Sequence, residues 1–302
     1  MKKQLIAMAL ATAFSIPALA QQATVYGIID QAYRVTSPDV GASSKGIVSG
    51  SFATSRIGVR GTEDLGGGLT ASFTLEGALG AGTGAVGSGS NLFSRESSFT
   101  LAGGFGAVTM GRTDTSASEG IDTLAGGANF GNFAFVSGVE YAGDRESTVR
   151  YTSPRIAGLQ AQIGRSLAST QGAETDSYSL TYSQGAVSLG AGHDKAGRDD
   201  YTAVGARYDF GFAAAGVMAG RRDAAGIETD VLAVSARVPL PQGFAAHGAY
   251  RTTEVGTTKT AVSTVGVSKA LSKRTTLVAL YQDTDKGAAA GTLAQVGLVH
   301  SF

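Results

Sequence analysis

The charged residues best placed to do chemistry lie in one long segment near the middle of the chain. Between residues 113 and 143 the acidic residues Asp114, Glu119, Asp122 and Glu140 occur without any Lys or Arg. The flanking residues are basic, with Arg112 before the segment and Arg145 and Arg150 after it. A long connection between strand-like runs is most often functional in a compact domain. We interpret it as an acidic loop that faces basic residues across an aqueous passage, which would sort ions by charge.

Motifs of enzymes are absent from the sequence. The three histidines, His193, His247 and His300, are isolated, and no HExxH, GxSxG or paired-carboxylate motif occurs. The glycines at 66–68 precede no helical pattern and do not form a phosphate loop. The chain has no Cys, which excludes disulfides and thiolate metal sites. We therefore expect no catalytic residue, no metal and no cofactor.

The rest of the chain consists of runs that alternate between apolar and polar residues, the period of a half-exposed strand. Sixteen such runs are expected, near residues 23–35, 50–61, 68–79, 91–103, 106–112, 146–153, 158–168, 176–184, 186–195, 199–210, 212–222, 227–238, 243–254, 259–270, 274–284 and 291–302. Short connectors alternate with longer ones, most clearly in the first half. This pattern predicts an all-β fold, a transmembrane antiparallel barrel with short turns on one side and long loops on the other.

The alternation also predicts which face of each strand meets lipid. Near the end of the chain, Val296 and Leu298 alternate with Gln295 and Gly297. Within SRIGVRG, Arg56 and Arg60 share one face and Ile57 and Val59 the other. A Lys or Arg on the lipid face at mid-depth costs roughly 2–4 kcal/mol, so the arginines are expected to point inward. A soluble β-sandwich would also alternate, but it seldom uses so many strands.

Composition agrees with an exported barrel. Lys2 and Lys3, a short apolar run and the small residues 18–20 form a signal peptide over residues 1–20, so that the barrel domain is expected at 21–302. The 44 glycines against 5 prolines favour many strands with tight bends. Without Lys2 and Lys3 the charge falls from 0 to −2, which gives no support to a nucleic-acid partner.

Several motifs resemble the general porins of Gram-negative bacteria, in particular the beta-proteobacterial type. They are TVYGIIDQAY (24–33), SRIGVRGTEDLGGGLTASFTLE (55–76), LFSRESSFTLAGGFGAVTMGR (92–112), TVRYTSP (148–154) and the final His300-Ser301-Phe302. The resemblance implies a sixteen-stranded barrel, a homotrimer and a long third loop folded into the lumen as the constriction. It also implies that Phe302 is the signal read by the barrel-assembly machinery. The chain departs from the family in having shorter external loops.

The resemblance further implies an arginine ladder at the constriction. Its expected members are Arg56, Arg95, Arg112 and Arg150, with Arg34 and Arg60 as weaker candidates, facing the loop acids Asp114, Glu119 and Asp122. The expected function is passive diffusion of ions and small hydrophilic solutes across the Gram-negative outer membrane, with a weak preference for anions. The expected partners are outer-membrane lipid, lipopolysaccharide, the assembly machinery and other copies of the chain.

Two other functions remain as alternatives. A substrate-specific outer-membrane channel would use an aromatic ladder for sugars or a dense cluster of one charge for phosphate. The chain has no Trp, and its 10 Tyr and 13 Phe suit interfacial girdles. A barrel enzyme with Ser and His on its wall is the weaker alternative, because no motif supports it.

Overall fold

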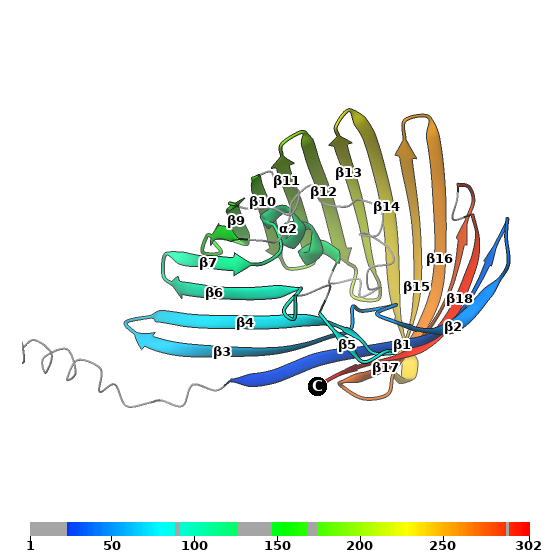
Figure 1. Ribbon diagram of the computed structural model, residues 1–302, viewed down its shortest axis with the longest axis horizontal. Coiled ribbons are helices and arrows are strands. Elements are labelled where there is room, and N and C mark those ends of the chain that lie inside the picture. Colours follow the sequence, from blue (N-terminus) through cyan, green and yellow to red (C-terminus); the bar gives the residue numbers. More distant parts are fainter. Residues whose placement is uncertain (1–22, 88–90, 126–146, 168–173, 288–289) are drawn as a thin grey trace, which may run out of the picture.

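The computed structural model describes residues 23–87, 91–125, 147–167, 174–287 and 290–302. The predicted signal peptide and residues 126–146 of the long acidic segment, including Glu140 and Arg145, lie outside the described residues. Figure 1 shows long strands that curve around a central space. The strands are β1 (Thr24–Pro38), β2 (Ser44–Ser49), β3 (Arg56–Gly66), β4 (Leu69–Gly80), β5 (Ala85–Val86), β6 (Glu96–Gly103), β7 (Gly106–Arg112), β8 (Thr148–Thr152), β9 (Leu159–Ser166), β10 (Thr175–Gln184), β11 (Val187–Ala196), β12 (Asp199–Asp209), β13 (Ala214–Ala224), β14 (Ile227–Leu240), β15 (Phe244–Val255), β16 (Thr258–Ala270), β17 (Thr275–Thr284) and β18 (Gly291–Ser301).

The strands close into a barrel because the last one pairs with the first. Neighbours run antiparallel around the sheet, and β18 pairs with β1 from Ile28↔Ser301 to Pro38↔Gly291. Both β2 and β3 pair with the same edge of β1 and are two parts of one interrupted strand, whereas β5 is a two-residue addition to β4. The 18 assigned strands therefore form a closed 16-strand barrel, as the sequence predicted. Closure leaves no unpaired sheet edge.

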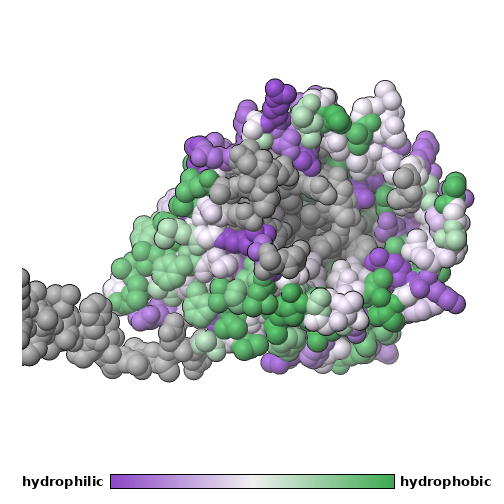
Figure 2. Space-filling view, in the orientation of Figure 1, coloured by the Kyte–Doolittle hydropathy of each residue, from purple (hydrophilic) through white to green (hydrophobic). Residues whose placement is uncertain are grey.

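The barrel is polar inside and apolar outside. Val296 and Leu298 are 46% and 47% exposed on the outer wall, whereas Gln295, directly before Val296, is 5% exposed. The same alternation holds on β10, where Tyr178 and Leu180 face outward. In Figure 2 hydrophobic residues gather over the lower part of the wall, and hydrophilic ones lie along the upper rim. The predicted facing of these strands is confirmed.

One part of the wall differs from the expected strand pattern. The strand expected at 50–61 begins only at Arg56, and the stretch expected as a loop at 36–49 contains the end of β1 and all of β2. Residues 50–55, which we call the inward segment, interrupt the strand between β2 and β3. Gly50 allows the break, since it adopts a φ of 69° that side chains rarely accept. The alternation alone could not locate this break, because both flanking strands pair with β1.

The long connection after β7 enters the barrel as a helix. The described helices are α2 (Ser116–Ala125) and the 3-10 helix η2 (Pro241–Gly243). Figure 1 shows α2 against β9 to β12, and its contacts are with those strands. It packs on Ser177, Ser179 and Gly192, which belong to the inner face of the wall, so α2 lies in the lumen. Over the described residues no helix is long and apolar enough to cross a membrane.

Candidate functional site

A charged cluster on the inner wall of β3, β4 and β6 is centred on Glu76. Its Oε1 lies 2.5 Å from Nε of Arg95 and 3.7 Å from a terminal nitrogen of Arg56. Its Oε2 accepts a hydrogen bond of 2.9 Å from the hydroxyl of Tyr26. Glu96 is the cross-strand partner of Glu76 and faces the same way. Two predicted arginines are therefore held by one carboxylate that was not among the predicted site residues.

The alternation of β3 explains why these side chains meet. Arg56 pairs with Ile28 and Ala78 on the inner face, while Ile57 between the two arginines is 37% exposed on the outer face. Arg60 follows on the inner face, and its guanidinium lies 4.8 Å from the ring centroid of Tyr26. A cation over an aromatic face is attracted to the ring. The ring therefore orients Arg60 toward the same cluster.

The helix α2 adds a second ion pair, made by Arg150 on β8. One of its terminal nitrogens lies 3.0 Å from Oε1 of Glu119, and the other donates a 3.0 Å hydrogen bond to the carbonyl of Asp114. Gln162 donates to the second oxygen of Glu119 at 2.9 Å. Of the predicted loop acids, Glu119 thus pairs with the wall beside it rather than with Arg56 or Arg95. The side chain of Asp114 interacts electrostatically with Arg56 and Glu96.

Small residues and one buried carboxylate hold α2 against the wall. A Cβ added to Gly192 would lie 2.8 Å from the Cα of Ala117, so only glycine allows this approach. Asp194 is fully buried and accepts hydrogen bonds from Ser177 at 2.5 Å and from Thr115 at 2.8 Å. The hydroxyl of Ser177 also accepts the backbone N–H of Ala117 at 3.0 Å. These contacts fix the first turn of the helix.

The inward segment is held in a similar way by Asp30 on β1. Its Oδ2 accepts the backbone N–H groups of Phe52 and, at 2.6 Å, of Ala53. The backbone N–H of Asp30 donates to the hydroxyl of Ser55 at 2.9 Å. Arg34 donates to Ser51 at 2.9 Å and to Gln295 at 2.8 Å. The structure therefore places the predicted site residue Arg34 as an anchor of this segment.

Arg112, Asp122 and Phe302 are the remaining predicted residues. Arg112 is the cross-strand partner of Ser97, next to the outward pair Phe99 and Met110, and its Nε donates to the carbonyl of Ser94 at 2.7 Å. Cross-strand partners share a face of the sheet, which separates Arg112 from the lumen-facing arginines. Asp122 lies in α2, but its side chain is outside the described part of the chain. Phe302 packs against Gly27 on the outer wall.

Sequence reasoning missed Glu76, Glu96, Asp30 and Asp194 as site residues. A usable signal was present, since each lies within a strand on its polar face. A charged side chain at that depth must face the lumen. The partners of these carboxylates lie far away in the sequence, so the pairs themselves could not be found from spacing.

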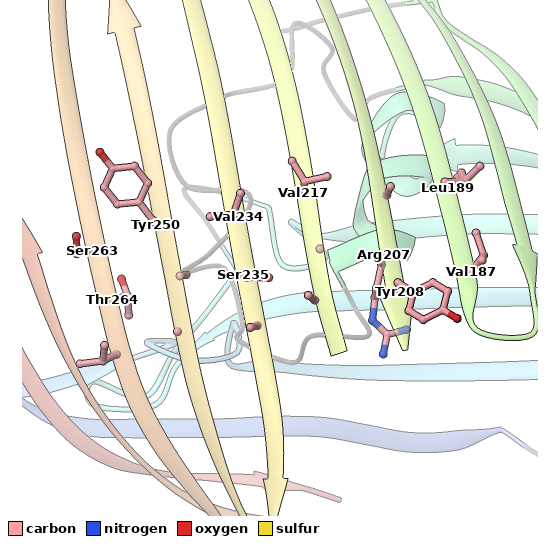
Figure 3. Close-up of a pocket in the computed structure, with 17 residues that line it drawn as sticks. Val187, Leu189, Arg207, Tyr208, Val217, Val234, Ser235, Tyr250, Ser263 and Thr264 are labelled. Atoms are coloured by element: carbon pink, nitrogen blue, oxygen red, sulfur yellow. The ribbon is translucent and has the colours of Figure 1, made fainter. Parts of the chain in front are cut away.

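One wide concavity among the described residues lies outside the pore. It has a volume of about 880 Å³ and crosses β11 to β16. Figure 3 shows Val217 and Val234 between Tyr208 and Tyr250 along its floor. These residues belong to the outward-facing set, with 43–47% of each side chain exposed. In a barrel of this polarity the concavity meets lipid and does not conduct solutes.

The lumen combines fixed charges of both signs with partial exposure to water. The pairs around Glu76 and Glu119 offset one another, and a unit charge at about 8 Å in water contributes only about 0.5 kcal/mol. Several such charges between low-dielectric walls shift ion populations without holding any one ion tightly. The arrangement suits the passage of solutes. Fold and site together define a channel-forming outer-membrane β-barrel.

Comparison with known proteins identifies the family. The sequence matches the Gram-negative porin family over residues 7–289, and the chain belongs to that family. It is 34% identical over 242 residues to outer membrane porin protein 32 of Delftia acidovorans, covering 70% of this chain and 67% of that protein. It is 32% identical over 186 residues to major outer membrane protein P.IB of Neisseria gonorrhoeae, covering 59% and 52%.

A solved structure has the same fold. The anion-selective porin from Comamonas acidovorans superposes with a TM-score of 0.80 at 25% sequence identity, covering 94% of this chain and 100% of that chain. The alignments with several relatives, including the Neisseria protein, span about half of their length. The predicted family and the outer-membrane location in a Gram-negative bacterium are confirmed.

Proposed function

We propose that the protein is a general diffusion pore, through which ions and small hydrophilic solutes pass passively with a weak preference for anions. The observation that carries the proposal is the polar inner wall of the closed barrel. A closed barrel has a polar inner wall, and α2 lies against that wall inside the barrel. The Comamonas relative, which is described as anion-selective, supports the sign of the preference.

The charges that set the preference are proposed to be Arg56, Arg60, Arg95 and Arg150. They face Glu76, Glu96 and Glu119, which compensate much of their charge. Such near-balance accounts for a weak preference rather than strict selectivity. Arg34 acts as an anchor, and Arg112 is left out of the proposed set because of its register.

Planar-bilayer conductance in a salt gradient tests the proposal. Purified folded protein is expected to give discrete current steps and a reversal potential that favours chloride. A reversal potential favouring potassium would keep the pore and overturn the anion preference. Absence of steps from protein shown to be folded would overturn the pore itself.

The working assembly is proposed to be a homotrimer in contact with lipid and lipopolysaccharide, inserted by the barrel-assembly machinery through Phe302. A structural feature supports close packing between copies. Glycines on the outer face of neighbouring strands are covered by flat aromatic rings, Gly27 by Phe302 and Gly61 by Phe73. This leaves a smooth wall near the closure of the barrel. Unboiled electrophoresis and crosslinking should show a threefold mass, and a single-chain mass under all mild conditions would contradict the trimer.

A further inference from the structure

Besides the concavity on the outer wall, the described residues form a cavity inside the lumen, on the side away from α2. It lies between the inward segment and the inner wall of β14 to β18, and its volume is about 330 Å³. Gly243, Ala270 and Thr276 lie at its lower edge, near the short turns at the end of the barrel that carries both termini. We call this cavity the inner pocket. Its size is at the lower end of the range of small-molecule sites.

One side of the inner pocket is apolar, which is unusual for the water-filled lumen of such a barrel. Val278 and Leu280 face inward from β17, opposite in register to Gly297 and Gln295 of β18. Phe52 of the inward segment is 7% exposed and packs on Leu280 in a cluster that also contacts Val278 and Val299. Covering such a surface with an apolar solute would remove it from water.

The other side of the inner pocket is basic. Its lining includes Arg56, Arg237 and His247, and none of its described lining residues is acidic. Arg237 and His247 are cross-strand partners on β14 and β15. His247 is oriented by a 2.6 Å hydrogen bond between its Nε2 and the hydroxyl of Ser268.

Arg237 differs from the arginines of the Glu76 cluster in its surroundings. Within the described residues it has no hydrogen bond and no salt bridge, and its guanidinium interacts electrostatically with His247 beside it. Arg56, in contrast, donates to the carbonyl of Thr54 at 2.9 Å and lies 3.7 Å from Glu76. The guanidinium of Arg237 therefore remains available for a carboxylate, which it can bind through two parallel hydrogen bonds.

We propose that the inner pocket binds an amphipathic organic anion, a carboxylate attached to an aromatic or branched aliphatic group. The carboxylate pairs with Arg237, and the apolar part packs against Phe52, Val278 and Leu280. The inference rests on the proposed function, since the solute reaches the pocket through the lumen. Because the site is open to water, affinity is on the order of 1 mM, which slows such anions without trapping them.

Single-channel recording tests the inference with phenylacetate as the probe. Acetate, which has the carboxylate but lacks the aromatic ring, is the control. Phenylacetate is expected to reduce the current in a saturable manner, whereas acetate at the same concentration should not. Arg237→Gln should raise the half-blocking concentration at least about tenfold, by loss of a charge-assisted pair. Leu280→Thr should raise it by about threefold to tenfold, through loss of apolar contact.

Arg198→Gln is the matched control, because Arg198 lies in the exposed turn between β11 and β12. Its half-blocking concentration should equal that of the unmodified protein. Titration calorimetry of phenylacetate into folded protein in detergent measures binding without conduction and decides the case if a variant does not fold. Equal effects of phenylacetate and acetate, or an unchanged midpoint in Arg237→Gln, would overturn the inference. Chloride steps without saturable block would leave the pore intact and reject only the inner pocket.

Discussion

Two segments of the chain, the helix α2 and the inward segment, insert into the lumen of the barrel. They are anchored in the same way, but they pack against different kinds of residues. Each is held by one fully buried aspartate on a wall strand, α2 by Asp194 and the inward segment by Asp30. The helix rests on small and polar residues such as Gly192 and Ser177. The inward segment instead places Phe52 on an apolar cluster.

The difference shows what an insertion into a water-filled barrel requires. Polar groups taken from water need new partners, and the two aspartates supply acceptors for them. An inserted segment also needs room beside the wall. Gly192 leaves that room beneath α2, and the apolar wall residues form a packing surface beneath Phe52. The result is a lumen with one charged side, formed by β3 to β8 and α2, and one amphipathic side, formed by β14 to β18.

The largest effect is expected from filling the space beneath the helix. Gly192→Leu would place side-chain atoms where Ala117 now lies, so α2 should be displaced from the wall. Because the new side chain pushes α2 further into the lumen, we expect the single-channel conductance to fall about twofold, since conductance follows the width of the narrow point. Gly248→Leu is the control, because a Cβ there meets open space. An unchanged conductance in Gly192→Leu would show that α2 does not set the width.

Asp30→Ala tests the anchor of the other insertion. Phe52 and Ala53 would lose the acceptor of their backbone N–H groups, at a cost of about 1–3 kcal/mol for each buried group. The thermal midpoint should fall, and the inner pocket should be lost with the inward segment. Asp39→Ala in the exposed connection after β1 is the control. A midpoint equal to that of the control would show that the carboxylate of Asp30 does not anchor the segment.

A double-mutant cycle tests whether the charges of the Glu76 cluster offset one another. Arg95→Gln should shift the reversal potential toward cations, because Glu76 loses its nearest counter-charge. Glu76→Gln should shift it toward anions, since it releases both Arg56 and Arg95. The double variant should return close to the original value, with each single shift on the order of a few kT in local potential. A double variant that keeps the full shift of either single variant would show that the two charges do not offset one another.

The smallest effect is expected at the ion pair of the helix. Glu119→Gln removes the pair with Arg150, but the side chain of Glu119 is 39% exposed and water screens it. The loss of stability should be about 0.5 kcal/mol, as for other exposed pairs. A fall in the thermal midpoint as large as that of Asp30→Ala would show that this pair is a main anchor of α2.

The sequence by itself determined the barrel, because alternation has a period of two and lipid tolerates only one face. That rule predicted the sixteen strands, the outward positions of Val296 and Leu298, and the inward position of Arg56. The long acidic segment also stood out from spacing alone, and its first part is the helix in the lumen. Residue type and period suffice for these features because each depends on neighbours along the strand.

Only the tertiary structure decided which charges meet and where the chain leaves the wall. Glu76 and Arg95 lie 19 residues apart, and Asp194 and Thr115 lie 79 apart. The pairing of β4 with β6 creates the first contact, and the entry of α2 into the lumen creates the second. The break at residues 50–55 is invisible in the alternation because β2 and β3 continue the same edge of β1. Arg237, Phe52 and Leu280 come together only because the sheet curves back on itself, which brings distant strands to one side of the lumen.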